Sequence, residues 1–570
     1  MRPKQNSSNA YDFHTTEMPL IEELNTSASD IRLSRANRAF RIVSSFPVLL
    51  GVLLVLGVFV GCQLFFVEGD TWLHIALGRE IMAIHAWPTT DSYSFTAQGK
   101  PAITTEWLCD LIMAAADRLA GSTGLMLLLM ALGAVLVLLV YYYAYLRSGN
   151  SKAAFVATMM LLPLLLPFLR LRPQLVGYIF LLITLICLEV FRAGNNRALW
   201  ILPGIFLVWV NTHGTFLFGL LVLGISGAAG LFHFSVGGLR AERWSAKQWR
   251  QLIRISLLSV LTLGLTPYGI RLAMFTLSAT LHSPLGMTKI GEYQPLGAFG
   301  ELLRPFLAFI VLLILAGLTL RLTYRLDEVG LLLLSIYLAC VHARLLLLFV
   351  LAFAPFLASL LSRWIPNYQP SKDHFVLNAF LIILVGVTLV RYFPVRQTLQ
   401  GKIAEEFPAQ AVEYLRQHPV EGSMLNQYKW GGYLMWTMGP EHKIFIDGRS
   451  VLYEAEGVYP DYLHIINLGP KTLSLLAKYG IQSCLIEPAE PLATLLRTMP
   501  QWERLYEDKV SVIFARKDLR KRSGALATGR SGLAPSDGPN HRTMAIMAEC
   551  LDPLRVSAIR YFEPLRFWTH

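Results

Sequence analysis

Asp70 and His74 are the residues of this chain whose types and spacing first suggest chemistry. They stand four residues apart, directly after the first long apolar stretch, 47–67. On a helix this spacing places both side chains on one face, so the imidazole can orient the carboxylate. A carboxylate at the mouth of a membrane-crossing helix is placed to accept a proton from a substrate at the membrane surface. An alternative stays open, because aspartate just before a helical segment is also a favoured helix cap.

Seven further polar residues stand in segments that connect other apolar stretches. Their carboxylates are candidates for acid–base chemistry, and their guanidinium and imidazole groups can bind an anion such as phosphate. They are Asp91, Glu106, Arg170, Arg172, His213, His342 and Arg344. Because these segments fall on the same side of the membrane in the topology predicted below, we expect the side chains to gather on one face.

Several of these residues also have a purely structural explanation. Asp91, in Pro-Thr-Thr-Asp-Ser, is typical of a turn, and Glu106 near a helix start can complement the helix dipole. Arg170 and Arg172 can extend to the membrane interface, and His213 can cap a helix end. The functional interpretation therefore depends on convergence of the group and on no single member.

The composition is that of a membrane protein. Hydrophobic residues make up 54% of the 570 residues and charged residues only 15%, with a mean hydropathy of +0.48. Soluble globular proteins carry roughly 25% charged residues. The net charge of +12 does not indicate a nucleic-acid partner, because the basic residues recur in short clusters between apolar stretches, as membrane topology requires.

The apolar stretches predict an α-helical protein that crosses the membrane about eleven times. Crossing about 30 Å of hydrocarbon takes about 17–25 residues, and the stretches at 198–212, 252–267 and 328–341 are short for this. The candidate spans are 47–67, 124–146, 153–170, 173–192, 198–212, 215–235, 252–267, 303–321, 328–341, 344–361 and 375–393.

The distribution of basic residues predicts the orientation of the chain. Arg32, Arg35, Arg38 and Arg41 precede the first span and place the N-terminus in the cytoplasm, and an odd number of spans sends the chain after Phe393 outside. The predicted parts are a flexible cytoplasmic segment 1–41, a transmembrane domain 42–397 with a first outer loop 68–123, an extracytoplasmic domain 398–518 and a disordered tail 519–570.

The first outer loop is predicted to hold two helices. Thr71–His85 repeats apolar residues at helical spacing, which favours an amphipathic helix lying on the membrane surface. A second helix is expected to begin near Trp107, with Thr104 or Thr105 as its N-cap. We interpret Trp72, Trp87 and Trp107 as membrane-interface anchors in preference to sugar-stacking platforms.

The segment after Phe393 reads as a small α/β domain, because expected helices at 407–418, 431–436 and 473–479 alternate with expected strands. The strands are 423–427, 443–446, 481–486 and a closing hairpin of 502–506 with 510–515. Asp447-Gly448-Arg449 follows a strand, where α/β folds place ligand contacts, although a turn held by an Asp–Arg pair explains it slightly better.

The sequence predicts no cofactor. Six cysteines are scattered without CxxC spacing, so no disulfide framework or zinc site follows from them. One carboxylate with a histidine four residues on is too few ligands for a divalent cation, and we predict no metal, with a divalent cation as the alternative.

A family resemblance adds to this. Gly-Asp-Thr-Trp-Leu-His at 69–74, Trp87-Pro-Thr-Thr-Asp-Ser-Tyr-Ser-Phe, Glu106-Trp-Leu, Arg170-Leu-Arg-Pro-Gln and Trp209-Val-Asn-Thr-His-Gly resemble segments of bacterial polytopic GT-C glycosyltransferases. These are related to dolichyl-phosphate-mannose protein mannosyltransferases and lipid A aminoarabinose transferases. The better-known members carry an Asp-Glu pair where this chain has Asp70-Thr71, so a second acidic role passes to Asp91 or Glu106, or is absent.

The resemblance implies a hexosyltransferase-class enzyme of the bacterial inner membrane. Its donor would be a polyprenyl-phosphate sugar, its acceptor a lipid, glycan or protein on the outer face, and membrane lipids would surround it. Asp70 would be the general base, and the outer-face arginines and histidines would bind the phosphate. The alternatives are a polytopic transporter or lipid flippase, and a non-catalytic subunit of envelope polysaccharide assembly.

Overall fold

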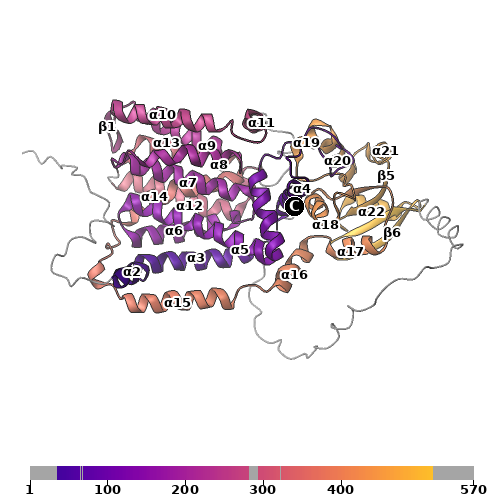
Figure 1. Cartoon of the computed structure of the whole chain (residues 1–570), viewed down its shortest axis with the longest axis horizontal. Helices are drawn as coiled ribbons and strands as arrows, with labels where there is room; N and C mark the ends of the chain where they lie inside the picture. Colours follow the sequence, from indigo (N-terminus) through magenta and orange to yellow (C-terminus); the bar gives the residue numbers. More distant parts are fainter. Residues whose placement is uncertain (1–34, 65, 67, 282–292, 321–322, 518–570) are drawn as a thin grey trace, which may run out of the picture. The chain divides into compact units, whose positions relative to one another are not determined.

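The computed structural model describes residues 35–64, 66, 68–281, 293–320 and 323–517. The chain divides into two units, Met1–Lys517 and Asp518–His570, and everything described here belongs to the first. Most of the predicted N-terminal segment and the predicted tail lie outside the described residues. Within the first unit, a helical bundle that ends at Arg391 is followed by a small domain of helices and strands (Figure 1).

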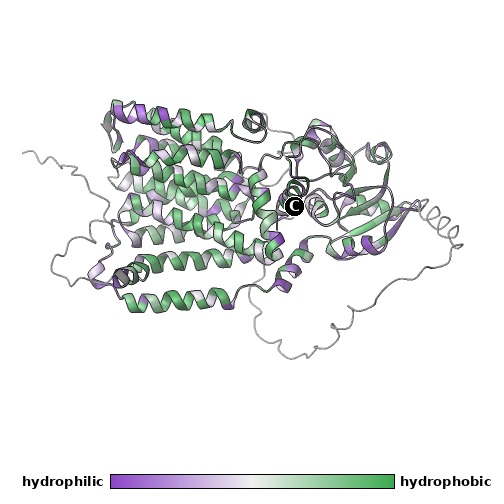
Figure 2. Ribbon diagram, viewed as in Figure 1, coloured by the Kyte–Doolittle hydropathy of each residue, from purple (hydrophilic) through white to green (hydrophobic). Residues whose placement is uncertain are grey.

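Within the described residues, six helices are long and apolar enough to cross a membrane, or seven when a bent pair counts as one span. Their side chains are mostly hydrophobic along the whole length of the bundle (Figure 2). They are α3 (Phe46–Leu64), α5 (Trp107–Ser148), α6 (Ser151–Leu165) with its 3-10 extension to Phe168, α7 (Pro173–Arg192), α12 (Gly300–Thr319) and α14 (Leu346–Leu361) with the preceding turn from Ala343. The bent pair is α15 (Phe375–Arg391) with α16 (Arg396–Glu406), at 59°. The prediction of a helical multi-pass membrane protein is confirmed.

The predicted count of eleven spans is not confirmed, although a helix lies within or across each predicted stretch. Outside the six candidate spans and the bent pair, four of the helices in these stretches have only 9–17 residues, at or below the lower limit of what hydrocarbon requires. They are α8 (Leu202–Val210), α9 (Phe216–Ala229), α10 (Ala246–Thr262) and α13 (Leu326–Val341). A further helix, α11 (Ile270–Leu281), forms where the sequence predicted only a connection.

Helix α5 is the centre of the bundle and packs against α3, α6, α7 and α14. Close approach of helix backbones needs small residues at the contact. Gly133 supplies one, because a Cβ there would lie 2.8 Å from a methyl group of Val58 on α3. The buried core is continuous from these helices into the following domain, where it includes Trp430 and Ile513.

Helix α4 (Gly69–Ile84) is not the surface helix that the sequence predicted. It lies between α5 and α18 (Gly431–Met438), and nine of its residues, from Thr71 to Gly78 and Ile81, are buried. Glycines allow this contact on both sides: a Cβ at Gly78 would lie 2.1 Å from the Asp110 carbonyl oxygen, and one at Gly432 would lie 2.8 Å from the Leu73 nitrogen. The prediction is wrong because the second buried face of α4 is made of small and polar residues, which apolar periodicity does not register.

The C-terminal domain has a four-stranded sheet in the order β4-β5-β7-β6. Its strands are β4 (Ser423–Asn426), β5 (Ile481–Ile486), β6 (Trp502–Glu507) and β7 (Val512–Arg516), with β4 parallel to β5 and the other pairs antiparallel. Its helices are α17 (Ala409–Gln417), α18, α19 (Ser450–Ala455), α20 (Val458–Ile466), α21 (Thr472–Lys478) and α22 (Pro491–Thr498).

The predicted α/β character and the closing hairpin are confirmed. The predicted strand at 443–446 is wrong, because Ile444 makes only an isolated bridge, to Ser94 of the first loop. A second small sheet, β1 (Phe234–Val236), β2 (Leu239–Ala241) and β3 (Tyr324–Arg325), belongs to the bundle.

Candidate functional site

Asp70 lies in the first turn of α4, and Glu68 takes the capping position. The Glu68 carboxylate accepts a hydrogen bond from the Gly69 nitrogen, so the alternative that Asp70 is the cap is wrong. The Asp70 carboxylate lies 3.2 Å from the guanidinium of Arg172, and 41% of its side chain stays exposed. Asp70 is thus the accessible member of a carboxylate–guanidinium pair, which is the state a general base requires.

A buried ion cluster around Glu68 supports this pair. Glu68 bonds to Arg170 and to Arg172, each at 2.5 Å. Burial alone would raise the pKa of Glu68, but the two guanidinium groups outweigh it and lower the pKa to about 2. The hairpin between α6 and α7 is therefore held against the start of α4 by a permanently charged carboxylate. Glu68 was not among the predicted site residues. The position of Glu68 directly before Gly69-Asp70 is the sequence signal that could have identified it.

A second group of ionisable side chains joins three segments. His74 on α4 bonds through Nδ1 to the Asp110 carboxylate at 2.7 Å, and its Nε2 lies 3.5 Å from Glu106. The other Glu106 oxygen lies 3.3 Å from Nε2 of His213, in the connection between α8 and α9. We call Asp110, His74, Glu106 and His213 the relay. Asp110, in the first turn of α5, is a member that the sequence analysis did not name.

The charge states along the relay differ. Burial would lower the pKa of His74, but Asp110, Glu106 and Asp70 raise it to about 9, so this imidazole is protonated at neutral pH. Burial, with the positive charges of Arg344, His74 and Arg172, lowers the pKa of His213 to about 3, so that imidazole is neutral. Its Nδ1 accepts the Thr215 backbone N–H, which leaves Nε2–H to donate to Glu106.

Glu106 stands between these two imidazoles and has a shifted pKa of its own. Burial raises the pKa of Glu106 to about 7, with Asp110 and Asp70 adding to the rise and His74 and Arg344 opposing it. A carboxyl group with a pKa near 7 exchanges a proton easily at neutral pH. The predicted N-cap at Thr104 or Thr105 is wrong: Glu106 holds the capping position of α5 and makes no capping bond with its side chain.

The Asp70–Arg172 pair and the relay interact electrostatically. The charge of Asp70 raises the pKa of both His74 and Glu106, and the charge of Arg344 lowers those of Glu106 and His213. Four predicted segments therefore meet at one end of the bundle, as the sequence analysis expected. The C-terminal domain reaches the same place, because a Cβ at Gly448 would lie 3.1 Å from an Asp70 carboxylate oxygen.

Arg344 and His342 both contact Tyr293. The Arg344 guanidinium lies 4.4 Å from the centre of the Tyr293 ring and bonds to Gln174 at 3.2 Å. His342 Nδ1 lies 2.6 Å from the Tyr293 carbonyl oxygen. Arg344 thus contacts Tyr293 and also acts on the relay through its charge. The described side-chain contacts of His342 are with Tyr293.

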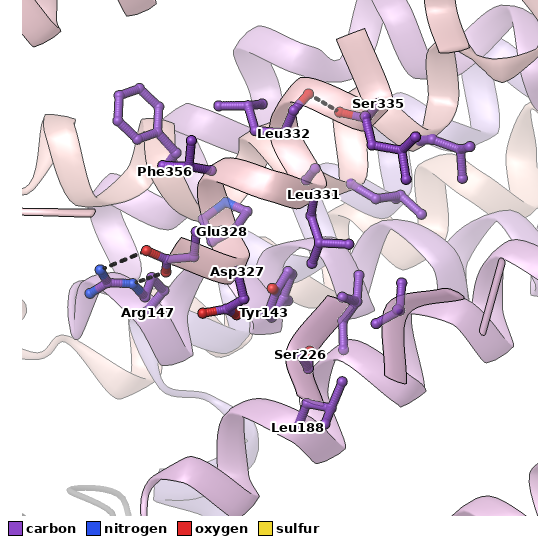
Figure 3. Close-up of a pocket in the computed structure, with 18 of the residues that line it drawn as sticks. Tyr143, Arg147, Leu188, Ser226, Asp327, Glu328, Leu331, Leu332, Ser335 and Phe356 are labelled. Atoms are coloured by element: carbon purple, nitrogen blue, oxygen red, sulfur yellow. Dashed lines mark hydrogen bonds and ion pairs between the residues drawn. The ribbon is translucent and has the colours of Figure 1, made fainter. Parts of the chain in front are cut away.

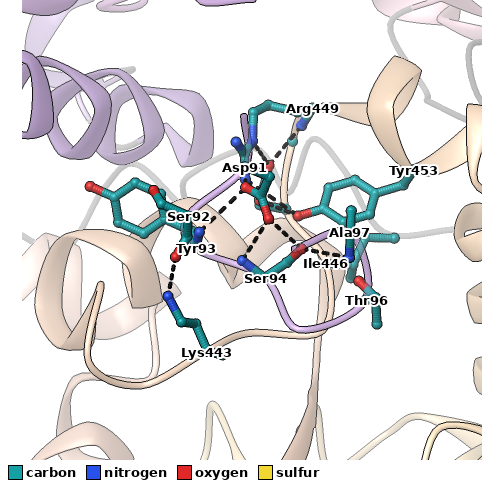
Figure 4. A network of polar contacts seen from close by, with 12 residues as sticks. Asp91, Ser92, Tyr93, Ser94, Thr96, Ala97, Lys443, Ile446, Arg449 and Tyr453 are labelled. Atoms are coloured by element: carbon teal, nitrogen blue, oxygen red, sulfur yellow. Dashed lines mark hydrogen bonds and ion pairs between the residues drawn. The ribbon is translucent and has the colours of Figure 1, made fainter. Parts of the chain in front are cut away.

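Asp91 has the contacts of a structural residue (Figure 4). Its buried carboxylate accepts hydrogen bonds from the Ser94 nitrogen and hydroxyl, and it lies 2.6 Å from the Arg449 guanidinium. Arg449 also bonds to Asp447, which in turn accepts from Tyr453. The Asp–Arg pair expected at 447–449 is present, and Asp91 extends it so that the first loop is fastened to the C-terminal domain. A role of Asp91 in substrate binding stays a prediction.

The tryptophans of the first loop take different positions. Trp72 is buried against Phe407, Tyr433 and Trp436, so its interpretation as an interface anchor is wrong. Trp107 donates from its ring nitrogen to Asn211, and Trp87, which is 45% exposed, packs edge-on against it. Trp87 is thus the accessible indole beside the relay.

Among the described residues, no group of three or more histidine, cysteine, aspartate or glutamate side chains is arranged to hold a metal ion. The relay contains two imidazoles and two carboxylates, and the Nε2 atoms of both imidazoles face the carboxylate of Glu106.

Comparison with known proteins gives matches among solved structures. No family model and no curated protein matches the chain. The fold is similar to that in the crystal structure of ArnT from Cupriavidus metallidurans bound to undecaprenyl phosphate, with 13% sequence identity and a TM-score of 0.45. The alignment covers 84% of this chain and 97% of that one. At this level of similarity, function has to be argued from the residues of this chain.

Proposed function

We propose that this protein is a membrane glycosyltransferase that moves a sugar from a polyprenyl-phosphate donor to an acceptor hydroxyl. The observation that carries the proposal is the exposed Asp70 carboxylate paired with Arg172, beside the buried relay, at one end of a membrane-spanning bundle. We place this end on the outer face of a bacterial inner membrane, with the N-terminus in the cytoplasm.

The proposed reaction has one displacement. The acceptor oxygen attacks the anomeric carbon, the bond from that carbon to the phosphate oxygen breaks, and the phosphate leaves with the electron pair. Asp70 takes the proton of the acceptor hydroxyl as the new bond forms. Such general-base assistance contributes typically about 10²–10⁴ in rate.

Positive charge for the departing phosphate comes from the arginines and from His74. Arg170 and Arg172 are already paired with Glu68, so their positive charge is partly used within the protein. The protonated His74 and Arg344 add two further cations close to Glu106. Charge-assisted bonds from such groups stabilise an anion that develops in a low-dielectric site.

Glu106 completes the charge balance in this proposal. Four cationic groups (Arg170, Arg172, Arg344 and His74) face four carboxyl groups (Glu68, Asp70, Asp110 and Glu106). An arriving phosphate makes the site more negative and therefore raises the pKa of Glu106 further. We infer that Glu106 takes up a proton when the donor binds, which frees His74 and Arg344 for the phosphate.

Glu106 is also the second candidate for the general base, because a pKa of about 7 suits proton abstraction at neutral pH. Substitution distinguishes the two. If Asp70 is the base, Asp70→Asn loses turnover, while Glu106→Gln keeps measurable turnover with donor binding at least as tight, because glutamine resembles the protonated acid. If Glu106 is the base, the loss of turnover follows Glu106→Gln instead.

The deciding experiment uses the purified full-length protein in vesicles with radiolabelled polyprenyl-phosphate sugars. Release of the sugar to an acceptor or to water, lost in Asp70→Asn and kept in the control Asp461→Asn, supports a transferase. Asp461 is a matched control because it forms a surface ion pair with Lys478 in the C-terminal domain. Movement of the labelled lipid across the vesicle without turnover would favour a flippase. Neither outcome would favour a non-catalytic assembly subunit.

A further inference from the structure

A cavity lies between α5, α7, α9, α13 and α14, away from the site described above (Figure 3). Its volume is about 110 Å³. The last turns of α5 and α7 contribute Arg147 and Arg192 to its lining, and the first turn of α13 contributes Asp327. Because α5 begins at the relay and ends here, the cavity and the candidate active site lie at opposite ends of that helix.

The cavity has an apolar part and a polar end. Leucines of several helices line most of it, among them Leu185, Leu331 and Leu351. The polar end carries two ion pairs, Arg147 with Glu328 at 2.5 Å and Arg192 with Asp327 at 2.6 Å. An apolar cavity comparable in size to engineered ones of about 150 Å³ stays dry and takes up small hydrocarbon groups.

Two buried polar atoms in this lining have no hydrogen-bond partner. They are Nη2 of Arg192 and the hydroxyl of Ser226, the second of which is labelled in Figure 3. A buried donor left without a partner costs about 1–3 kcal/mol. Both atoms can donate a hydrogen bond to an oxygen acceptor in the cavity.

The charges of the lining argue against an anionic ligand. Two guanidinium groups face two carboxylates, and behind them Arg325 makes a bidentate pair with Glu189 at 2.8 and 2.6 Å. A phosphate would have to displace one of these carboxylates, and breaking a buried pair is costly. A hydroxyl or an ester carbonyl oxygen needs no such exchange.

We propose that this cavity binds an uncharged amphipathic lipid, such as a long-chain alcohol, with its oxygen on Arg192 and Ser226 and the adjoining hydrocarbon among the leucines. The site is separate from the proposed donor site. It would therefore bind its ligand even in a protein without glycosyltransferase activity.

The test uses the full-length protein in phosphatidylcholine nanodiscs with a diazirine-bearing C16 alcohol. Cross-linked peptides are mapped by mass spectrometry after irradiation, with unlabelled hexadecanol or hexadecyl phosphate as competitor. We expect cross-links on α9 and α13 that hexadecanol removes and that hexadecyl phosphate leaves largely intact. Equal or stronger competition by the phosphate would overturn the uncharged head group, and labelling spread evenly over the lipid-facing helices would overturn the site.

Helix α13 offers a matched pair of variants. Leu331→Trp fills the cavity, whereas Leu333→Trp adds the same side chain at a position that is 61% exposed and outside the lining. Labelling should fall at least about fivefold in the first and stay unchanged in the second. Ser226→Ala removes one donor with little loss of volume and should weaken hexadecanol competition about fivefold, as expected for one hydrogen bond. Wild-type labelling in both Leu331→Trp and Ser226→Ala would contradict the proposal.

Discussion

The Asp70 carboxylate lies 3.2 Å from the Arg172 guanidinium, although the two residues come from the first turn of α4 and the start of α7. In the proposed reaction, this pair puts the proton acceptor and a phosphate-binding cation within one contact of each other. Glu68 contacts the same Nη2 atom of Arg172 at 2.5 Å, so the guanidinium is positioned by two carboxylates, of which Asp70 is the more exposed.

Arg172→Lys tests the geometry of this pair. A lysine keeps the charge but cannot bond to Glu68 and Asp70 with a planar fork. We expect kcat/KM for the donor to fall about tenfold to a hundredfold, with folding largely retained. Kinetics with labelled donor measure this, beside the exposed control Arg416→Lys on α17. Equal activity in the two variants would mean that the fork has no role.

Glu68→Gln tests the buried cluster as a structural element. Removing one partner of a buried ion pair leaves uncompensated charge and costs about 3–5 kcal/mol. Because the pKa of Glu68 is lowered to about 2 in the fold, its contribution is present above the ordinary value of 4.5 and is lost as the pH falls toward 2. Thermal unfolding in detergent should show a lower Tm for the variant at pH 7, and the difference should shrink toward pH 3. A constant difference would contradict the assignment.

The relay predicts the pH dependence of turnover. Because Glu106 takes up a proton when the donor binds, donor binding is favoured below about pH 7, and kcat/KM should fall as the pH rises through that value. His74 must stay protonated to attract the phosphate, so activity should fall as the pH passes about 9. A kcat/KM profile from pH 5.5 to 10 measures both falls. In Glu106→Gln the fall near pH 7 should disappear, and its persistence would show that another group titrates there.

Asp91→Asn distinguishes a structural role of Asp91 from a role in donor binding. An asparagine keeps the turn with Ser94 but loses the charged bond to Arg449, which costs about 1.5–3 kcal/mol. The Tm should fall, while KM for the donor per folded molecule stays at the wild-type value. A raised KM with an unchanged Tm would indicate that Asp91 binds the donor.

The sequence predicted the parts of this protein that depend on local pattern. Long apolar stretches became helices, the hairpin of β6 and β7 follows the expected alternation, and Asp70, Glu106, Arg172 and His213 meet as the topology required.

The errors come from contacts that no local pattern records. Helix α4 is buried because Gly78 and Gly432 admit backbones from both sides, and those glycines carry no apolar signal. Asp110 and Glu68 escaped notice because a buried carboxylate is recognised by its partners, which lie far away in the sequence. The count of eleven spans stays a prediction, because several of the apolar helices are shorter than a bilayer crossing requires.

In the proposed function, Asp70 is the general base of a glycosyl transfer. The most direct measurement is the single-turnover release of labelled sugar from a polyprenyl-phosphate donor by Asp70→Asn, compared with wild type at saturating donor. We predict a rate lower by about 10²–10⁴ with donor affinity within severalfold of wild type. A variant that turns over at the wild-type rate would contradict the account.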